Sequence, residues 1–150
     1  MPSVNGIPSD GEWFLAEAEG AASVIRARQD LLPRALDSGL TQRVVVTWRC
    51  RAPLESGLPS EADYEEIAQF EELLVRFLEH GAILAFVITE DGGANLNFYT
   101  SSQDWFLERL ADALTDELMM RIELSGEEDP DWSEYQAVLE AAGKGRPPSL

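Results

Sequence analysis

The sequence predicts one α+β domain, in which two helices cover one face of a four-stranded antiparallel sheet. The main observation is the order of hydrophobic patterns from residue 41 onward, which runs strand, helix, strand, strand, helix, strand. This order is typical of the ferredoxin-like, split βαββαβ arrangement. A length of 150 residues and a hydrophobic content of 45% fit one globular domain, which we place at residues 11–142.

The N-terminal region predicts a tail, a hairpin and a connector. Residues 1–10 are polar and rich in Pro, Gly and Ser, which indicates a flexible tail. Two extended runs, 12–18 and 22–28, flank a turn that contains Gly20, so we expect a β-hairpin. Residues 30–40 contain a proline and a glycine and predict a connector with a short turn of helix.

The first predicted strand and helix follow. Residues 41–51 hold a β-branched and aromatic run that is typical of a buried strand. Ser60 is the predicted N-cap of a helix whose apolar residues recur at spacings of three and four. His80 and Gly81 form the predicted C-terminal stop.

The second half repeats the alternation of strands and helices. Residues 82–89 are almost continuously apolar, which predicts a strand covered on both faces. After the turn at 91–93, residues 94–100 alternate as in a half-buried strand, and Ser101 or Ser102 caps a second helix. The remaining predictions are a strand at 118–124, an acidic loop at 126–131, a short helix at 132–142 and a flexible tail at 143–150.

Trp132 and Tyr135 share one face of that last helix, so we expect them to anchor it to the sheet. Asp129 is its predicted cap, with Pro130 in the first turn.

Two alternatives stay open for the sheet. The hairpin is either an addition beside the four strands or an extension that pairs onto one edge and widens the sheet. In either case the face away from the two helices is predicted to be open and to carry polar groups: Asn95, Asn97, Tyr99, Arg121 and Glu123. The hairpin, a second copy of the chain or a foreign protein can cover this face.

Composition excludes several classes of function. Eleven Lys and Arg against twenty-eight Asp and Glu give a formal net charge of −17, which argues against direct binding of nucleic acid or of an anionic membrane. The longest apolar run, 82–88, is too short to span a bilayer, and the first residues lack the features of a secretion signal. We therefore expect a cytoplasmic protein.

No catalytic or metal-binding constellation stands out, so we predict a protein that is not an enzyme and needs no cofactor and no metal. His80 is the single histidine and Cys50 the single cysteine, so these residue types cannot form a metal-binding cluster. The two residues are also far apart in the sequence, so nothing pairs the thiol of Cys50 with a base. We interpret His80 as a helix cap and Cys50 as an inert core thiol. The segment 129–140 imitates a calcium loop, but its sixth position is Glu134 where the sharp turn needs glycine.

The acidic excess has two interpretations. The net charge is −1 over residues 1–50 and −8 over each of 51–100 and 101–150, so it follows the predicted helices. It either keeps the protein soluble or attracts a basic protein partner. For the second interpretation, the predicted contacts are Glu65, Glu72, Glu79, Glu127 and Glu128.

Several motifs resemble the bacterial domain of unknown function 695 family. They are the early Trp13, residues 57–60 before an acidic helix, residues 88–89 and 98–100 around a glycine turn, and the closing run 129–135. The resemblance runs from about residue 13 to 135. It implies a small α+β protein related in shape to the type B regulator of ribonuclease activity, an acidic inhibitor of a ribonuclease, and it implies no catalytic residues.

These observations predict a non-enzymatic, acidic protein-binding module. Its expected role is that of an inhibitor or immunity-type partner of a basic protein such as a ribonuclease or a toxin. One alternative is a small ligand-binding or hydrolytic domain that uses the open sheet face. The other is a structural homodimer.

Overall fold

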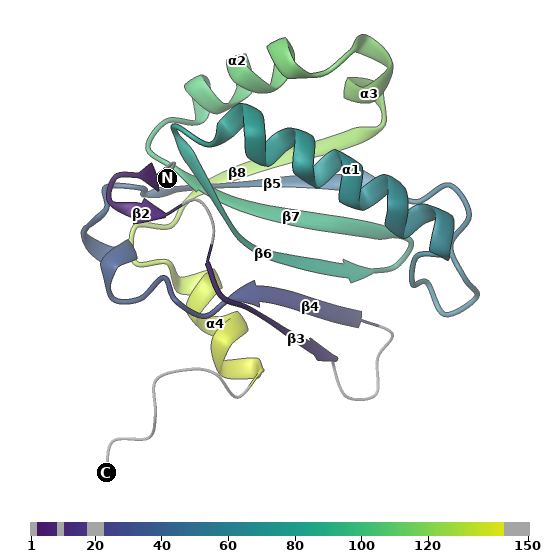
Figure 1. The fold of residues 1–150 in the computed structure, drawn as a ribbon, viewed down its shortest axis with the longest axis horizontal. Helices are drawn as coiled ribbons and strands as arrows, with labels where there is room; N and C mark the ends of the chain where they lie inside the picture. Colours follow the sequence, from purple (N-terminus) through teal and green to yellow (C-terminus); the bar gives the residue numbers. More distant parts are fainter. Residues whose placement is uncertain (1–2, 9–10, 18–22, 143–150) are drawn as a thin grey trace.

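The structure is a computed structural model that describes residues 3–8, 11–17 and 23–142. Its centre is a six-stranded antiparallel sheet, which confirms the α+β class (Figure 1). The strand order is β3-β4-β6-β7-β5-β8. The strands are β3 (Trp13–Glu17), β4 (Ser23–Arg28), β5 (Gln42–Arg49), β6 (Ala82–Glu90), β7 (Gly93–Thr100) and β8 (Ile122–Glu128).

The predicted hairpin, β3 and β4, widens the sheet. Strand β4 pairs with β6, so that Ile25 lies opposite Ile88. This is the second of the two arrangements that the sequence left open. The sheet is therefore larger than a four-stranded one, and the narrower assignment of a ferredoxin-like topology stays a prediction. The turn of the hairpin, residues 18–22, lies outside the described residues.

Helices lie on both sides of the sheet. Figure 1 shows α1 (Glu61–Leu78) and α2 (Gln103–Ala113) together on one face, as predicted. A short α3 (Asp116–Met120) follows α2, and α4 (Ser133–Ala141) packs on the opposite face near β4. The connector before β5 holds one turn of 3₁₀ helix, η1 (Arg34–Asp37).

The start of α1 is fixed by a capping box. Ser60 accepts a hydrogen bond from the backbone N–H of Asp63, and the Asp63 carboxylate accepts one in return from the N–H of Ser60. The same carboxylate also accepts from the N–H groups of Arg51, at 2.9 Å, and Ala52, at 3.1 Å. One buried side chain therefore ties the segment after β5 to the first turn of α1.

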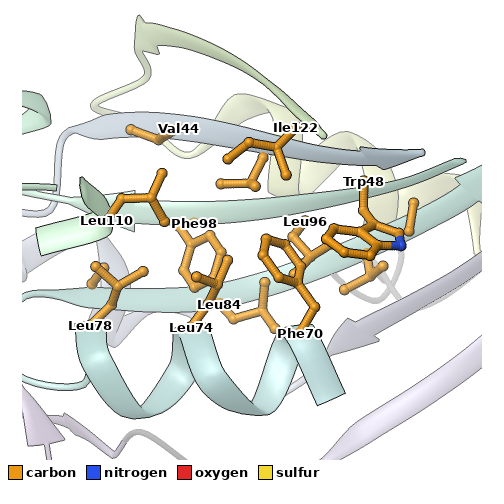
Figure 2. Close-up of a cluster of buried hydrophobic side chains, with 14 of the residues drawn as sticks. Val44, Trp48, Phe70, Leu74, Leu78, Leu84, Leu96, Phe98, Leu110 and Ile122 are labelled. Atoms are coloured by element: carbon orange, nitrogen blue, oxygen red, sulfur yellow. The ribbon is translucent and has the colours of Figure 1, made fainter. Parts of the chain in front are cut away.

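The larger core lies between the sheet and the helices α1 and α2 (Figure 2). Side chains from β5, β6 and β7 meet Phe70 and Leu74 of α1 and Leu110 of α2. The rings of Trp48 and Phe70 are tilted by 31° with centroids 4.4 Å apart, and Phe98 meets Phe106 edge to face at 5.3 Å. The predicted apolar stripe of α1 faces this core because its spacing matches the helical period.

A second core lies on the opposite face and corrects the predicted N-terminal tail. Strands β1 (Ser3–Val4) and β2 (Ile7–Pro8) form a small hairpin whose Val4 and Ile7 are fully buried. These two side chains pack with residues of η1, β6 and α4. Burial of two apolar side chains holds residues 3–8 against the protein. The predicted C-terminal tail, 143–150, lies outside the described residues.

The segment between α2 and α4 also differs from the prediction. Residues 116–120 form α3, because Thr115 accepts a hydrogen bond from the N–H of Leu118 and acidic residues occupy the first turn. The last strand therefore begins at Ile122 and continues to Glu128, through the first half of the predicted acidic loop. Its pairing with β5, from Trp48 opposite Ile122 to Gln42 opposite Glu128, explains the extension.

Candidate functional site

The polar sheet face predicted from β7 exists, but its groups are engaged with one another. Asn97 is buried, and its side-chain oxygen accepts a hydrogen bond from Nη1 of Arg43 at 2.6 Å. Asn95 is half-buried and accepts from the hydroxyl of Thr47 at 2.7 Å. Both asparagines therefore brace β7 against β5, which leaves few of their polar groups for a ligand.

Tyr99 lies in a buried aromatic cluster, which corrects its predicted place on an open face. Trp132 stacks on the Tyr99 ring with centroids 3.7 Å apart. The Tyr99 hydroxyl donates to Oδ2 of Asp129 at 2.6 Å. Burial, together with this carboxylate, raises the pKa of Tyr99 far above its ordinary value. Tyr99 is therefore a neutral structural group at physiological pH.

Asp129 is the cap of α4 that the sequence predicts. Its carboxylate accepts hydrogen bonds from the N–H groups of Ser133, at 2.8 Å, and Glu134, at 3.1 Å. The predicted anchors are also in place, because Tyr135 donates to the backbone oxygen of Arg28 and Trp132 donates to that of Leu40. Helix α4 thus covers the part of the sheet that the sequence predicted to be open.

Arg121 lies on the other side of the sheet, away from Asn95, Asn97 and Tyr99. It follows α3, and its guanidinium carbon lies 4.1 Å from the centroid of the Trp48 ring in the larger core. Its Nη2 donates to the backbone oxygen of Arg49 at 2.7 Å. The predicted four-residue site is therefore not assembled. The error came from treating 118–124 as one strand, which gave Arg121 the wrong face.

The five acidic residues predicted to contact a partner do not form one patch. Glu65 and Glu72 are exposed on α1, and Glu79, two turns beyond Glu72, is half-buried. Glu127 points to the opposite sheet face, where it forms an ion pair with Arg43. Glu128, its neighbour, points to the face that carries the helices. The three on α1 lie along one side of the helix at intervals of two turns, with Gln69 and Arg76 between them, and we call this side the acidic stripe.

A groove with a volume of about 810 Å³ lies beside α1. Its floor is the part of the sheet formed by β3, β4 and the end of β6, and its wall is α1. Most of its lining is apolar, and two of its large apolar side chains are unusually exposed: Leu15 at 66% and Tyr64 at 44%. An exposed apolar surface of this kind is typical of a binding site.

Charged residues border the apolar part of this groove. Arg26 of β4 forms an ion pair with Glu71 of α1 across the junction of floor and wall, and its guanidinium lies over the Trp13 ring. Glu17 of β3 and Glu72 of α1 lie in the lining and are exposed. Glu72 belongs to the predicted set of partner contacts. Leu15 and Tyr64 were not identified from the sequence, because their exposure depends on the pairing of β4 with β6 and on the position of α1.

Cys50 and His80, the two residues considered for chemistry, lie near opposite ends of α1. Burial, followed by the charge of Asp63, raises the pKa of the Cys50 thiol, which disfavours the reactive thiolate. His80 follows the end of α1 and lies 3.6 Å from Glu79. In the part of the chain that the structure describes, His, Cys, Asp and Glu do not gather in threes that can hold a metal ion. No helix there combines the length and the apolar composition of a membrane span.

Fold and surface together define a small α+β protein with a six-stranded sheet, an acidic helix and an apolar groove beside that helix. The chain belongs to the family of unknown function DUF695, whose model matches residues 11–139. This match confirms the resemblance seen in the sequence. No curated protein and no solved structure shows significant similarity to the chain.

Proposed function

We propose that this protein is a non-enzymatic binding module for a basic protein, in the manner of an inhibitor or an immunity protein. The observation that carries the proposal is the groove beside α1, which combines exposed apolar side chains with exposed carboxylates at its border. Apolar area supplies affinity, and the carboxylates favour partners of opposite charge. A net charge of −17 extends this preference over the whole protein.

The alternatives receive less support. A homodimer through the groove would bring two chains of charge −17 together, which like-charge repulsion opposes. A ligand site on the polar sheet face would have to break the contacts of Asn95 and Asn97 with β5. We further propose that the protein is similar in shape to a ribonuclease regulator and that it is cytoplasmic.

Affinity capture from the native cell extract tests the proposal. The immobilised protein should retain a basic protein at low salt and release most of it in about 0.5 M salt, where screening is strong. A double variant, Glu65→Lys with Glu72→Lys, should lose the captured protein because it reverses charge along the acidic stripe.

The matched control is Glu134→Lys with Glu140→Lys, which makes the same charge change at exposed positions of α4. This control should retain the captured protein. The proposal fails if no basic protein is retained, or if the two double variants behave alike.

A further inference from the structure

Within residues 3–8, 11–17 and 23–142, no helix covers β3 and β4 on the face that carries α1 and α2. Each strand takes about 4.8 Å of the width of a sheet, so six strands occupy about 29 Å. Packed helices lie about 10 Å apart, so two of them cover about four strands. Helix α1 packs over β6 and contacts α2, which packs over β5. The uncovered width therefore equals that of one more helix.

The groove occupies this missing position. Leu15 of β3 and Val24 of β4 lie on its floor, and Ala68 and Val75 of α1 form part of its wall. In a layer of helices on a sheet, an added helix contacts two surfaces. These surfaces are the face of the sheet and the side of the neighbouring helix. An extended segment would fill less of this width than a helix does.

The charges around the groove define the kind of helix. The lining carries Glu17, Glu71 and Glu72 against Arg26 and Arg76. Glu71 is paired with Arg26, and Glu72 lies 3.9 Å from Arg76 in an exposed pair that solvent screens. Exposed Glu17 lies on the floor side and exposed Glu72 on the wall side. A helix that presents an apolar stripe with basic residues along its two borders would match both carboxylates.

We infer that the groove binds an amphipathic, basic helix of the partner, which packs beside α1 on β3 and β4 as a third helix of this layer. This inference rests on the proposed function and adds to it the secondary structure and the polarity of the bound segment. The charge of the chain favours a foreign basic helix over the helix of a second copy.

Synthetic peptides test the inference directly. The first is a helical peptide of leucine and lysine with leucines at helical spacing. The second is a strand-forming peptide of the same composition with alternating leucine and lysine, and the third is a scrambled peptide. The helical peptide should bind at least about ten-fold more tightly than the other two in isothermal titration calorimetry. Its helical circular dichroism should rise when it binds.

Two charge-neutral variants locate the binding site. Leu15→Gln removes an exposed leucine of the groove floor, and Leu124→Gln removes an exposed leucine from β8, the strand at the other edge of the sheet. Both side chains lie on the face that carries α1 and α2. Leu15→Gln should weaken binding of the helical peptide about ten-fold, and Leu124→Gln should leave it unchanged.

The outcomes separate this inference from the proposed function. Equal binding of the three peptides, or preference for the alternating peptide, would overturn the inference. The inference would also be overturned if the Leu15→Gln variant captured the basic protein as well as the original chain does. In that case the proposed function, binding of a basic protein, would still hold. A change of oligomeric state on Leu15→Gln in sedimentation would assign the groove to a second copy instead. Absence of any captured basic protein would contradict the proposed function itself.

Discussion

Substitution of Asp63 by alanine should destabilise the protein more than any other change in the first turn of α1. The Asp63 carboxylate is buried and accepts hydrogen bonds from the N–H groups of Arg51 and Ala52 and from Ser60. Loss of a helix cap costs about 1 kcal/mol. A hydrogen bond to a charged group contributes about 1.5–3 kcal/mol, and buried donors are left without an acceptor. We expect a loss of about 3 kcal/mol in the free energy of unfolding.

Urea unfolding followed by circular dichroism measures this loss. For a chain of this size, about 3 kcal/mol corresponds to a fall in melting temperature of roughly 6–12 °C. Glu61→Ala is the matched control, because Glu61 is exposed in the same turn and lies near the positive end of the helix dipole. The control should lose less than about 1 kcal/mol. Asp63→Asn should lie between the two, because it keeps one oxygen acceptor.

The effect of Asp63→Ala should also depend on pH. Burial opposes ionisation of Asp63, but the hydrogen bonds from Arg51, Ser60 and Ala52 outweigh it, so the pKa lies below the ordinary 3.8. A lowered pKa in the folded state gives stability that is present above pH 3.8 and is lost as the pH falls through the folded value. The difference between the original chain and Asp63→Ala should therefore shrink in acid. A loss below about 1 kcal/mol at neutral pH would refute the reasoning, as would a difference that does not change with pH.

Three further predictions concern the aromatic cluster under α4. Tyr99→Phe should lower the free energy of unfolding by about 1–2 kcal/mol in urea, because Asp129 loses a buried donor; an unchanged value would show that this bond is not important. Trp132→Ala should cost about 3–5 kcal/mol by the same measurement, since Trp132 is fully buried against Tyr99; a smaller cost would mean that α4 repacks. Burial raises the pKa of Tyr135 to about 12 from its usual 10.0, so its contribution to stability is complete below pH 10 and should be lost as the pH rises toward 12. A phenolate titration of the native and the urea-unfolded protein checks this shift, and identical curves would contradict it.

Local signals predicted much of the fold. The period of apolar residues in α1, the cap at Ser60 and the turn at Asp91 depend on neighbours in the sequence, and all three agree with the structure. The secondary structure of residues 116–124 was harder to predict. Alternating apolar residues suggested a strand, whereas Thr115 and the acidic turn after it start a helix. The two signals compete, and pairing of β8 with β5 decides the boundary.

The candidate site depends on contacts that no local pattern contains. Whether Tyr99 is exposed depends on α4, more than 30 residues later in the chain, and on Asp129 beside it. The groove exists because β4 pairs with β6, which places the hairpin where no helix covers it. The sequence predicted Glu72 through its position on the acidic stripe, whereas Leu15 becomes significant only once that pairing is known.

The charges on the last strand, β8, affect how molecules of this protein can associate with one another. It lies at an edge of the sheet, where unpaired backbone groups can recruit another chain. Glu123 and Glu127 of β8 form ion pairs with Arg49 and Arg43, and Glu128 adds a further exposed carboxylate to the strand. Charged side chains on an edge strand oppose its pairing with another chain, so β8 is protected from edge-to-edge aggregation.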